Sequence, residues 1–331
     1  MEQKINTRGI IESALMAGII TIILMATLYL PLMYIVGVVI LPIPVAVLYY
    51  RHEFKYVAGC IVVSIAITSM FSNPIIAISS SISYSLVGGT IGYCIKNKKK
   101  PYKTLILVIL ASIISFIGEA WLVARLINNT NLFGFIREQL VMYSETMNAA
   151  MESAKSFYSS MGMSATQLQM LDQAASIFTV EAFIIYLPAV ILLYGFLVSY
   201  ICFGITRKIL IKLRYKDIET LNFSEFYVSN LLGAALISII SIGIIVNSRG
   251  VEWALLLYNA TMLVTMVLMA INGVAVTNYF LTKKMNMNKS PRTFMIVIIF
   301  ILGSYIIFSI IGFVEMILDF RKLDPHRLRK A

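Results

Sequence analysis

The sequence predicts an all-α polytopic membrane protein, a bundle of eight or nine transmembrane helices. Apolar residues make up 59% of the 331 residues, whereas only 13% are charged. A soluble domain carries about 25% charged residues, because part of each helix must face water. The apolar residues are also grouped into runs close to the roughly 20 residues that cross a bilayer as a helix. Composition therefore excludes an ordinary soluble domain and a disordered chain.

Nine apolar stretches are candidates for spans. Their apolar residues are continuous rather than alternating, which favours helices over the strands of a barrel. Irregular backbone in lipid would leave N–H and C=O groups unpaired, so each stretch is expected to be helical. The third stretch is short and the eighth is long. The stretches are 10–30, 32–50, 56–71, 75–95, 104–127, 178–206, 228–247, 252–281 and 294–318.

Local signals mark several of these elements. Pro42 and Pro44 interrupt the hydrogen-bond ladder of the second stretch and predict a kink. The pair Asn73-Pro74 predicts a tight turn between the third and fourth stretches. No small-residue cleavage site precedes Pro31, so the first stretch is expected to remain as a helix rather than to be a cleaved signal.

Basic residues give an orientation. With a cytoplasmic N-terminus, the inner loops hold most of the Lys and Arg, whereas the outer segments hold Arg125, Arg137, Lys155 and Arg249. The tail conflicts with this pattern, because a ninth span would place its five basic residues outside. Eight or nine spans therefore remain open. The basic inner loops, including 96–100, are expected to bind anionic lipid headgroups rather than nucleic acid.

The chain divides into three parts. Residues 1–206 are expected to form a six-helix membrane bundle with an outer loop at 128–177, and 207–227 is a basic cytoplasmic linker. Residues 228–331 hold two or three further helices and a basic tail. The outer loop has apolar residues at helical spacing, and Ser164 with Gln167 resembles a capping box that opens a second helix. This loop is either a lid over the bundle or a passive surface helix pair.

No catalytic, metal or cofactor motif is present. The chain lacks HExxH, GxSxG, CxxC and GxxxxGK[ST], so we do not expect an enzyme or a P-loop ATPase. Cys60, Cys94 and Cys202 lie in or at the end of different spans and are expected to be buried small hydrophobes.

Small residues recur at spacings that let two helices approach closely in lipid. They occur in the first and fourth apolar stretches. Internal packing of the bundle explains such a pattern, and so does docking of another subunit. The residues are Ala14 and Gly18 in the first stretch and Ser81, Ser85, Gly88 and Gly92 in the fourth.

One carboxylate is unusual for its depth. Glu119 lies eight residues before the expected outer end of the fifth stretch, where a charged side chain is costly. With Arg125, Glu181, Trp121 and Asn73, it predicts a polar outward-facing site for a small ligand or a coupling cation. The alternative is a structural Glu–Arg ion pair at the membrane interface. Glu12 is a weaker candidate, because Arg8 lies four residues earlier on the same helix.

A polar stripe follows one face of the eighth stretch. Its members are Thr261, Thr265, Asn272 and Tyr279, at spacings of four, seven and seven residues. In lipid such a stripe should face protein or a water-lined path. Interhelical hydrogen bonding is the favoured role.

Three segments carry a family resemblance: 272–284, 312–322, and Pro42-x-Pro44 followed by Tyr49-Tyr50-Arg51. They resemble the YybS-like family of uncharacterised bacterial membrane proteins, catalogued as domain of unknown function 2232. Glu315 departs from the resemblance, since a small or apolar residue is expected at its position. The resemblance implies a multi-pass protein of the bacterial cytoplasmic membrane and no established activity.

That family is remotely similar to the substrate-binding S components of energy-coupling-factor transporters. The similarity implies a solute pocket on the outer side of six helices, and docking of a coupling protein or ATPase module at Ala14 and Gly18. We therefore expect transport-type binding of a small solute at the outer half of the first bundle. The alternative is a non-transporting scaffold or regulator that binds other envelope proteins.

Overall fold

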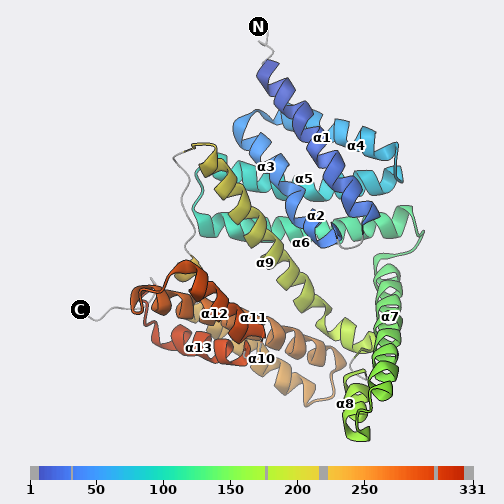
Figure 1. The fold of residues 1–331 in the computed structure, drawn as a ribbon, viewed down its shortest axis with the longest axis vertical. Helices are drawn as coiled ribbons and strands as arrows, with labels where there is room; N and C mark the ends of the chain where they lie inside the picture. The colour runs from blue at the N-terminus through green and yellow to red at the C-terminus, as the bar shows by residue number, and fades with distance from the viewer. Residues whose placement is uncertain (1–6, 31–32, 176–177, 216–222, 302–304, 324–331) are drawn as a thin grey trace. The chain divides into compact units, whose positions relative to one another are not determined.

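The computed structural model describes residues 7–30, 33–175, 178–215, 223–301 and 305–323 (Figure 1). Every regular element in these ranges is helical. The chain divides into two units, the first comprising Met1–Val180 and Ile191–Thr220 and the second Glu181–Val190 and Leu221–Ala331. Parts of the predicted basic linker and tail, 216–222 and 324–331, lie outside the described residues.

The first unit contains helices from the N-terminal two thirds of the chain. Pro residues open three of them, at a position where the missing N–H has no intrahelical partner to lose. The helices are α1 (Thr7–Tyr29), α2 (Met33–Ile40), α3 (Pro42–Arg51), α4 (Phe54–Ser69), α5 (Pro74–Lys96), α6 (Pro101–Leu126), α7 (Leu132–Ser160), α8 (Ala165–Ala175) and α9 (Val180–Lys212), of which Glu181–Val190 are assigned to the second unit.

The predicted kink in the second apolar stretch falls at Leu41, the one residue between α2 and α3. Leu41 keeps α-helical φ and ψ of −55° and −39°, and its N–H donates to the Gly37 carbonyl at 2.9 Å, as in an uninterrupted helix. Pro42 has no N–H to donate to the Val38 carbonyl four residues earlier. The Val38 carbonyl therefore lacks the donor that a continuous helix would provide.

The small-residue seam of α5 packs inside the first unit. A Cβ on Gly92 would lie 2.7 Å from the Ala46 carbonyl oxygen of α3, and one on Gly88 would overlap the Pro42 carbonyl. Ser81 is fully buried and accepts a hydrogen bond from the Tyr84 hydroxyl at 2.9 Å. Ser85 is half-buried on the same helix. At Gly88 and Gly92 the seam is covered by α3, so internal packing accounts for the small residues at these two positions.

The α1 pair has different surroundings. Ala14 is exposed, and a Cβ on Gly18 would meet nothing within 4 Å. Within the described part of the chain, this face of α1 therefore has room for a neighbouring helix.

The predicted outer loop is helical, as α7 and α8. The predicted capping box is present: the Gln167 N–H donates to Ser164 Oγ at 3.4 Å, and the Ser164 N–H donates to Gln167 Oε1 at 3.1 Å. A salt bridge of 2.6 Å joins Lys155 of α7 to Asp172 of α8. The predicted helical structure of this loop is therefore confirmed.

The second unit contains the C-terminal helices. A 3-10 turn, η1 (Phe223–Glu225), precedes them. The helices are α10 (Asn230–Asn247), α11 (Glu252–Lys283), α12 (Lys289–Ile301) and α13 (Tyr305–Leu318). The prediction of one span over 294–318 is wrong, because α12 and α13 are two separate short helices (Figure 1). Seven helices or helix pairs of the described chain are long and apolar enough to cross a membrane, and α4 and part of α13 are shorter apolar helices.

α13 runs parallel to α11. Ser309 Oγ donates to the Met266 carbonyl at 3.0 Å, and Asn272 Nδ2 donates to the Gly312 carbonyl at 2.9 Å. Later residues of α13 thus meet later residues of α11. The backbones of the two helices approach closely at this contact, because a Cβ on Gly312 would overlap the Met269 carbonyl oxygen.

The end of α13 lies at the end of the second unit where α10 begins. Arg321, just after α13, donates to the Ser224 carbonyl at 2.8 Å, and Asn278 of α11 donates to Ser224 Oγ at 2.7 Å. α12 begins at the same end, because Arg292 in its first turn donates to Thr282 of α11. Together α12 and α13 leave one end of the unit and return to it. Lys322 therefore lies at the same end of the second unit as Lys284.

This geometry predicts the sidedness of three engineered cysteines. With Cys60, Cys94 and Cys202 replaced by Ala, Lys284→Cys and Lys322→Cys are expected to react with a membrane-impermeant maleimide from the same side. Ser248→Cys, after the other end of α10, is expected to react from the opposite side. Oriented vesicles with accessible and protected faces provide the measurement. Labelling of Lys322→Cys together with Ser248→Cys would contradict the hairpin path.

Candidate functional site: a cavity beside Glu119

Glu119 lies on a polar face of α6. Ser112, Ser115 and Glu119 follow the spacing i, i+3 and i+7, so their side chains share one side of the helix. Ser80 of α5 donates its hydroxyl to Glu119 Oε1 at 2.8 Å. Among the described residues, no Lys, Arg or His makes a salt bridge with Glu119. The carboxylate is thus held by a neutral donor.

A cavity of about 70 Å³ lies beside this carboxylate. Its walls come from α1, α2, α5, α6 and α9 and from Leu41 and Pro42, where α2 meets α3. A water molecule needs roughly 10–15 Å³ of such volume, so the cavity has room for a few small species. Its polar side chains include Tyr34, Ser80, Ser83, Ser115, Glu119 and Tyr194.

Hydrogen bonds and one aromatic contact hold the walls of this cavity together. Ser112 and Ser199 share a hydrogen bond of 3.0 Å between α6 and α9, and Ser115 donates to the Ser83 carbonyl of α5 at 3.2 Å. The rings of Phe116 and Tyr194 lie 4.8 Å apart between centroids. α6 is therefore fixed against both neighbours at the depth of Glu119.

The other residues proposed from the sequence do not line this cavity. Arg125 and Trp121 lie six and two residues after Glu119, about 240° and 200° around the helix axis, and both are exposed. Asn73 caps α5, where its Oδ1 accepts from the Ile75 N–H at 2.9 Å. Glu181 is exposed near the start of α9 and belongs to the second unit. The expected Glu119–Arg125 pair is thus absent from the described residues.

Sequence reasoning missed several of the lining residues. Ser112 and Ser115 carry a usable signal, because they share the helical face of Glu119. Tyr34 and Tyr194 carry none, since each follows from the way that α2 and α9 pack against α6.

Glu12 belongs to a second polar cluster of the first unit. Its carboxylate bonds Arg8 at 3.0 Å, as predicted, and also Arg51 at 2.8 Å and His52 at 2.8 Å. Lys96 donates to the His52 carbonyl at 2.8 Å. These contacts join the N-terminal part of α1 to the end of α3 and the end of α5, and they leave Glu12 fully paired.

The residues of the polar stripe on α11 make different kinds of contact. Thr265 donates to the Thr261 carbonyl within the helix, and Tyr279 lies under the Lys283 ammonium. Asn272 is fully buried and bonds Gly312 and Arg321, both outside α11. Its predicted interhelical hydrogen bonding is confirmed for this residue.

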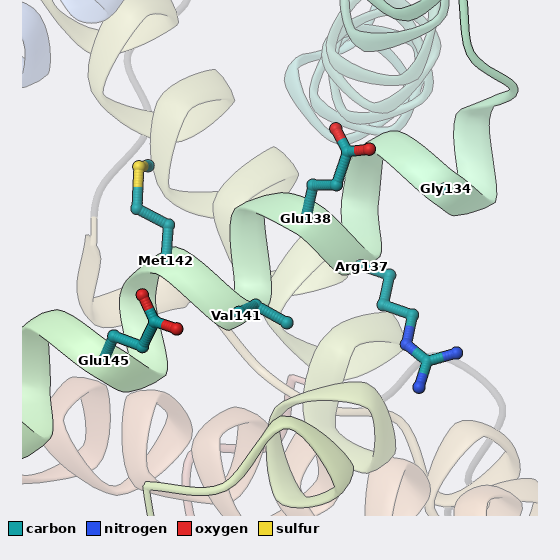
Figure 2. A pocket seen from close by; sticks show the side chains of 6 residues that line it. All are labelled: Gly134, Arg137, Glu138, Val141, Met142 and Glu145. Atoms are coloured by element: carbon teal, nitrogen blue, oxygen red, sulfur yellow. The ribbon is translucent and has the colours of Figure 1, made fainter.

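A larger hollow lies on α7 but does not have the form of a binding site. Its volume is about 510 Å³, and all six residues that line it belong to α7. Figure 2 shows Arg137 and Glu138 directed away from each other, so their charges do not converge on one point. Among the described residues, no group of three His, Cys, Asp or Glu side chains is placed to hold a metal ion. The cavity at Glu119 is therefore the better candidate.

Comparison with known proteins identifies the family of the chain. No curated protein and no solved structure matches it. A family model described as a predicted membrane protein, DUF2232, matches residues 18–316, which include the cavity and the α11–α13 contact. The chain therefore belongs to the DUF2232 family of predicted membrane proteins.

Proposed function

We propose that the first unit is a transport-type binding module that takes a small solute into the cavity at Glu119. The observation that carries this proposal is a carboxylate within a membrane helix that has a cavity beside it and a serine, rather than a cation, as its partner. A charged group in a membrane helix is expensive, and such groups mark ion and substrate paths. A purely structural ion pair would place a basic side chain on Glu119.

The open face of α1 supports an S-component-like use of this module. Ala14 is exposed and a Cβ on Gly18 would meet nothing within 4 Å in the described chain, so a coupling protein with a complementary small-residue helix has room to dock. The α5 seam does not contribute, because α3 covers it. A scaffold that uses the same α1 face is the alternative, and it requires no ligand in the cavity.

A thermal-shift screen of the purified full-length protein tests the proposal. The panel contains vitamins, small amines and metal ions. A ligand at 100 times its Kd is expected to stabilise the protein by about 2.7 kcal/mol. Glu119→Gln is expected to lower the affinity of the hit at least about tenfold, a loss of about 1.4 kcal/mol.

Glu152→Gln is the matched control, because Glu152 is exposed on α7. It should retain the affinity of the unmodified protein. A panel without any hit, or a hit equally tight in Glu119→Gln, would argue against solute binding at this cavity.

A further inference from the structure

We infer that the ligand of the Glu119 cavity is a monovalent alkali-metal cation, with Na⁺ as the best fit, held by Glu119, neighbouring hydroxyls and the Val38 carbonyl that Pro42 leaves without a helical donor. This inference rests on the proposed function and specifies its ligand. Four features of the cavity support it: charge, donor atoms, backbone geometry and size.

The charge of the lining matches one positive charge. Glu119 carries the one carboxyl group among the described residues that line the cavity, and none of them is Lys, Arg or His. A monovalent cation would leave the site neutral, whereas a divalent cation would leave an uncompensated charge among membrane helices. Divalent sites in proteins usually contain several carboxylates, which this lining does not have.

The donor atoms are all oxygen. The polar side chains of the lining are those of Ser, Thr, Tyr and Glu, and the described lining contains no His, Cys, Met or basic residue. Hydroxyl, carboxylate and carbonyl oxygens suit hard cations, whereas soft transition metals favour nitrogen and sulfur. The absence of cationic side chains from this described lining also disfavours an anionic solute.

One backbone carbonyl at the lining lacks its helical donor. Val38 and Pro42 both line the cavity, and Pro42 cannot donate to the Val38 carbonyl. Backbone carbonyls of membrane helices that lack their helical donor coordinate cations in this way. Pro42 thus leaves the Val38 carbonyl oxygen available to bind a cation.

The size of the cavity excludes larger ligands. Pockets that bury drug-sized molecules measure about 300–1,000 Å³. The volume here is about 70 Å³, enough for a cation with a few waters. A vitamin would need the helices to move apart.

Sodium binding to the purified full-length protein is the direct test. Thermal unfolding is measured in NaCl, KCl, LiCl and choline chloride at equal ionic strength, and bound ²²Na⁺ is counted at equilibrium. We expect a saturable stabilisation by Na⁺ over choline and a stoichiometry of about one ion per chain. Glu119→Gln is expected to remove the Na⁺-dependent shift, and Ser80→Ala, which keeps the charge, to weaken the apparent affinity at least threefold.

Two further variants separate binding from folding. Pro42→Ala restores an N–H that can pair with the Val38 carbonyl, and it is expected to weaken Na⁺ binding while the protein stays folded. Glu152→Gln is expected to bind Na⁺ like the unmodified protein. Both are assessed by size-exclusion profile and by their unfolding temperature in choline chloride. An equal Na⁺ shift in Glu119→Gln would overturn the inference.

The outcomes distinguish the two proposals. If an organic solute binds in a Glu119-dependent manner while Na⁺, K⁺ and Li⁺ give the same stability as choline, the cation inference is wrong and the binding module stands. If neither the alkali cations nor any organic solute binds, both are wrong. Competition among the three alkali cations decides which of them the site prefers.

Discussion

Replacement of Arg321 by Met is expected to lower the free energy of unfolding by about 3–5 kcal/mol, the cost of breaking a buried ion pair. The Arg321 side chain is 0% exposed, and its Nε lies 2.7 Å from Glu315 Oε1. It also donates to the Ser224 carbonyl at 2.8 Å and to Asn272 Oδ1 at 2.9 Å. Without Arg321, Glu315 is left as an uncompensated buried carboxylate, and three elements of the second unit lose their common donor.

The paired variant tests this cause. Arg321→Met with Glu315→Met removes both charges and is expected to recover most of the lost stability, because apolar replacements of a buried pair are often tolerated. Arg249→Met is the matched control, since Arg249 is exposed and its effect should stay within about 0.5 kcal/mol. Denaturant unfolding in detergent micelles measures all three variants. If Arg321→Met were as stable as Arg249→Met, the Arg321–Glu315 pair would not contribute to the stability of the protein.

The same network explains an irregularity in the sequence. Glu315 stands where the family resemblance favours a small or apolar residue, and its position alone gives no reason for a carboxylate. In the structure its partner Arg321 follows six residues later, after a turn in which Asp319 has φ of 47°. Asn272, from a segment 49 residues earlier, completes the set. A contact of this kind depends on the packing of α11 against α13, which the local sequence does not encode.

The depth of Glu119 was predictable, but its neighbours were only partly so. A carboxylate in an apolar stretch is recognisable from the sequence, because a charged side chain within a membrane helix is energetically costly. The spacing of Ser112 and Ser115 also places them on the same face of the helix as Glu119. Arg125 and Trp121 were proposed from proximity in sequence, which ignores that residues six or two apart lie on different sides of a helix. Ser80 and Tyr194 come from helices whose order around α6 only the fold supplies.

The number of spans could not be predicted from the sequence for a different reason. Hydropathy measures how apolar a segment is, and it does not report the direction in which the segment runs. The stretch 294–318 is long and apolar enough to be considered one span, yet α12 and α13 leave and return to the same end of the second unit. The basic residues of the tail conflicted with a ninth span, and the return of α13 to the end where α12 begins is the arrangement that hydropathy does not report.

Substitution of Gly312 by Ala is expected to destabilise the second unit by at least about 3 kcal/mol, at the upper end of the cost of overpacking. A Cβ at this position would overlap the Met269 carbonyl oxygen and lie 2.8 Å from the Gly273 nitrogen. Both obstacles are backbone atoms of α11, so a side-chain rotation cannot relieve the clash. The helices must separate, and the Asn272–Gly312 hydrogen bond of 2.9 Å would be lost with them.

Gly59→Ala makes the same chemical change, but it is expected to stabilise the protein. Gly59 lies within α4 and a Cβ there would meet nothing within 4 Å, so the variant should gain about 0.5–1 kcal/mol from helix propensity. Denaturant unfolding of both variants in detergent measures the contrast. Equal stability of Gly312→Ala and Gly59→Ala would mean that α13 is not seated on α11. If α13 is seated there, the close approach at Gly312 also supports the buried Arg321, because Asn272 donates to the Gly312 carbonyl and accepts from Arg321.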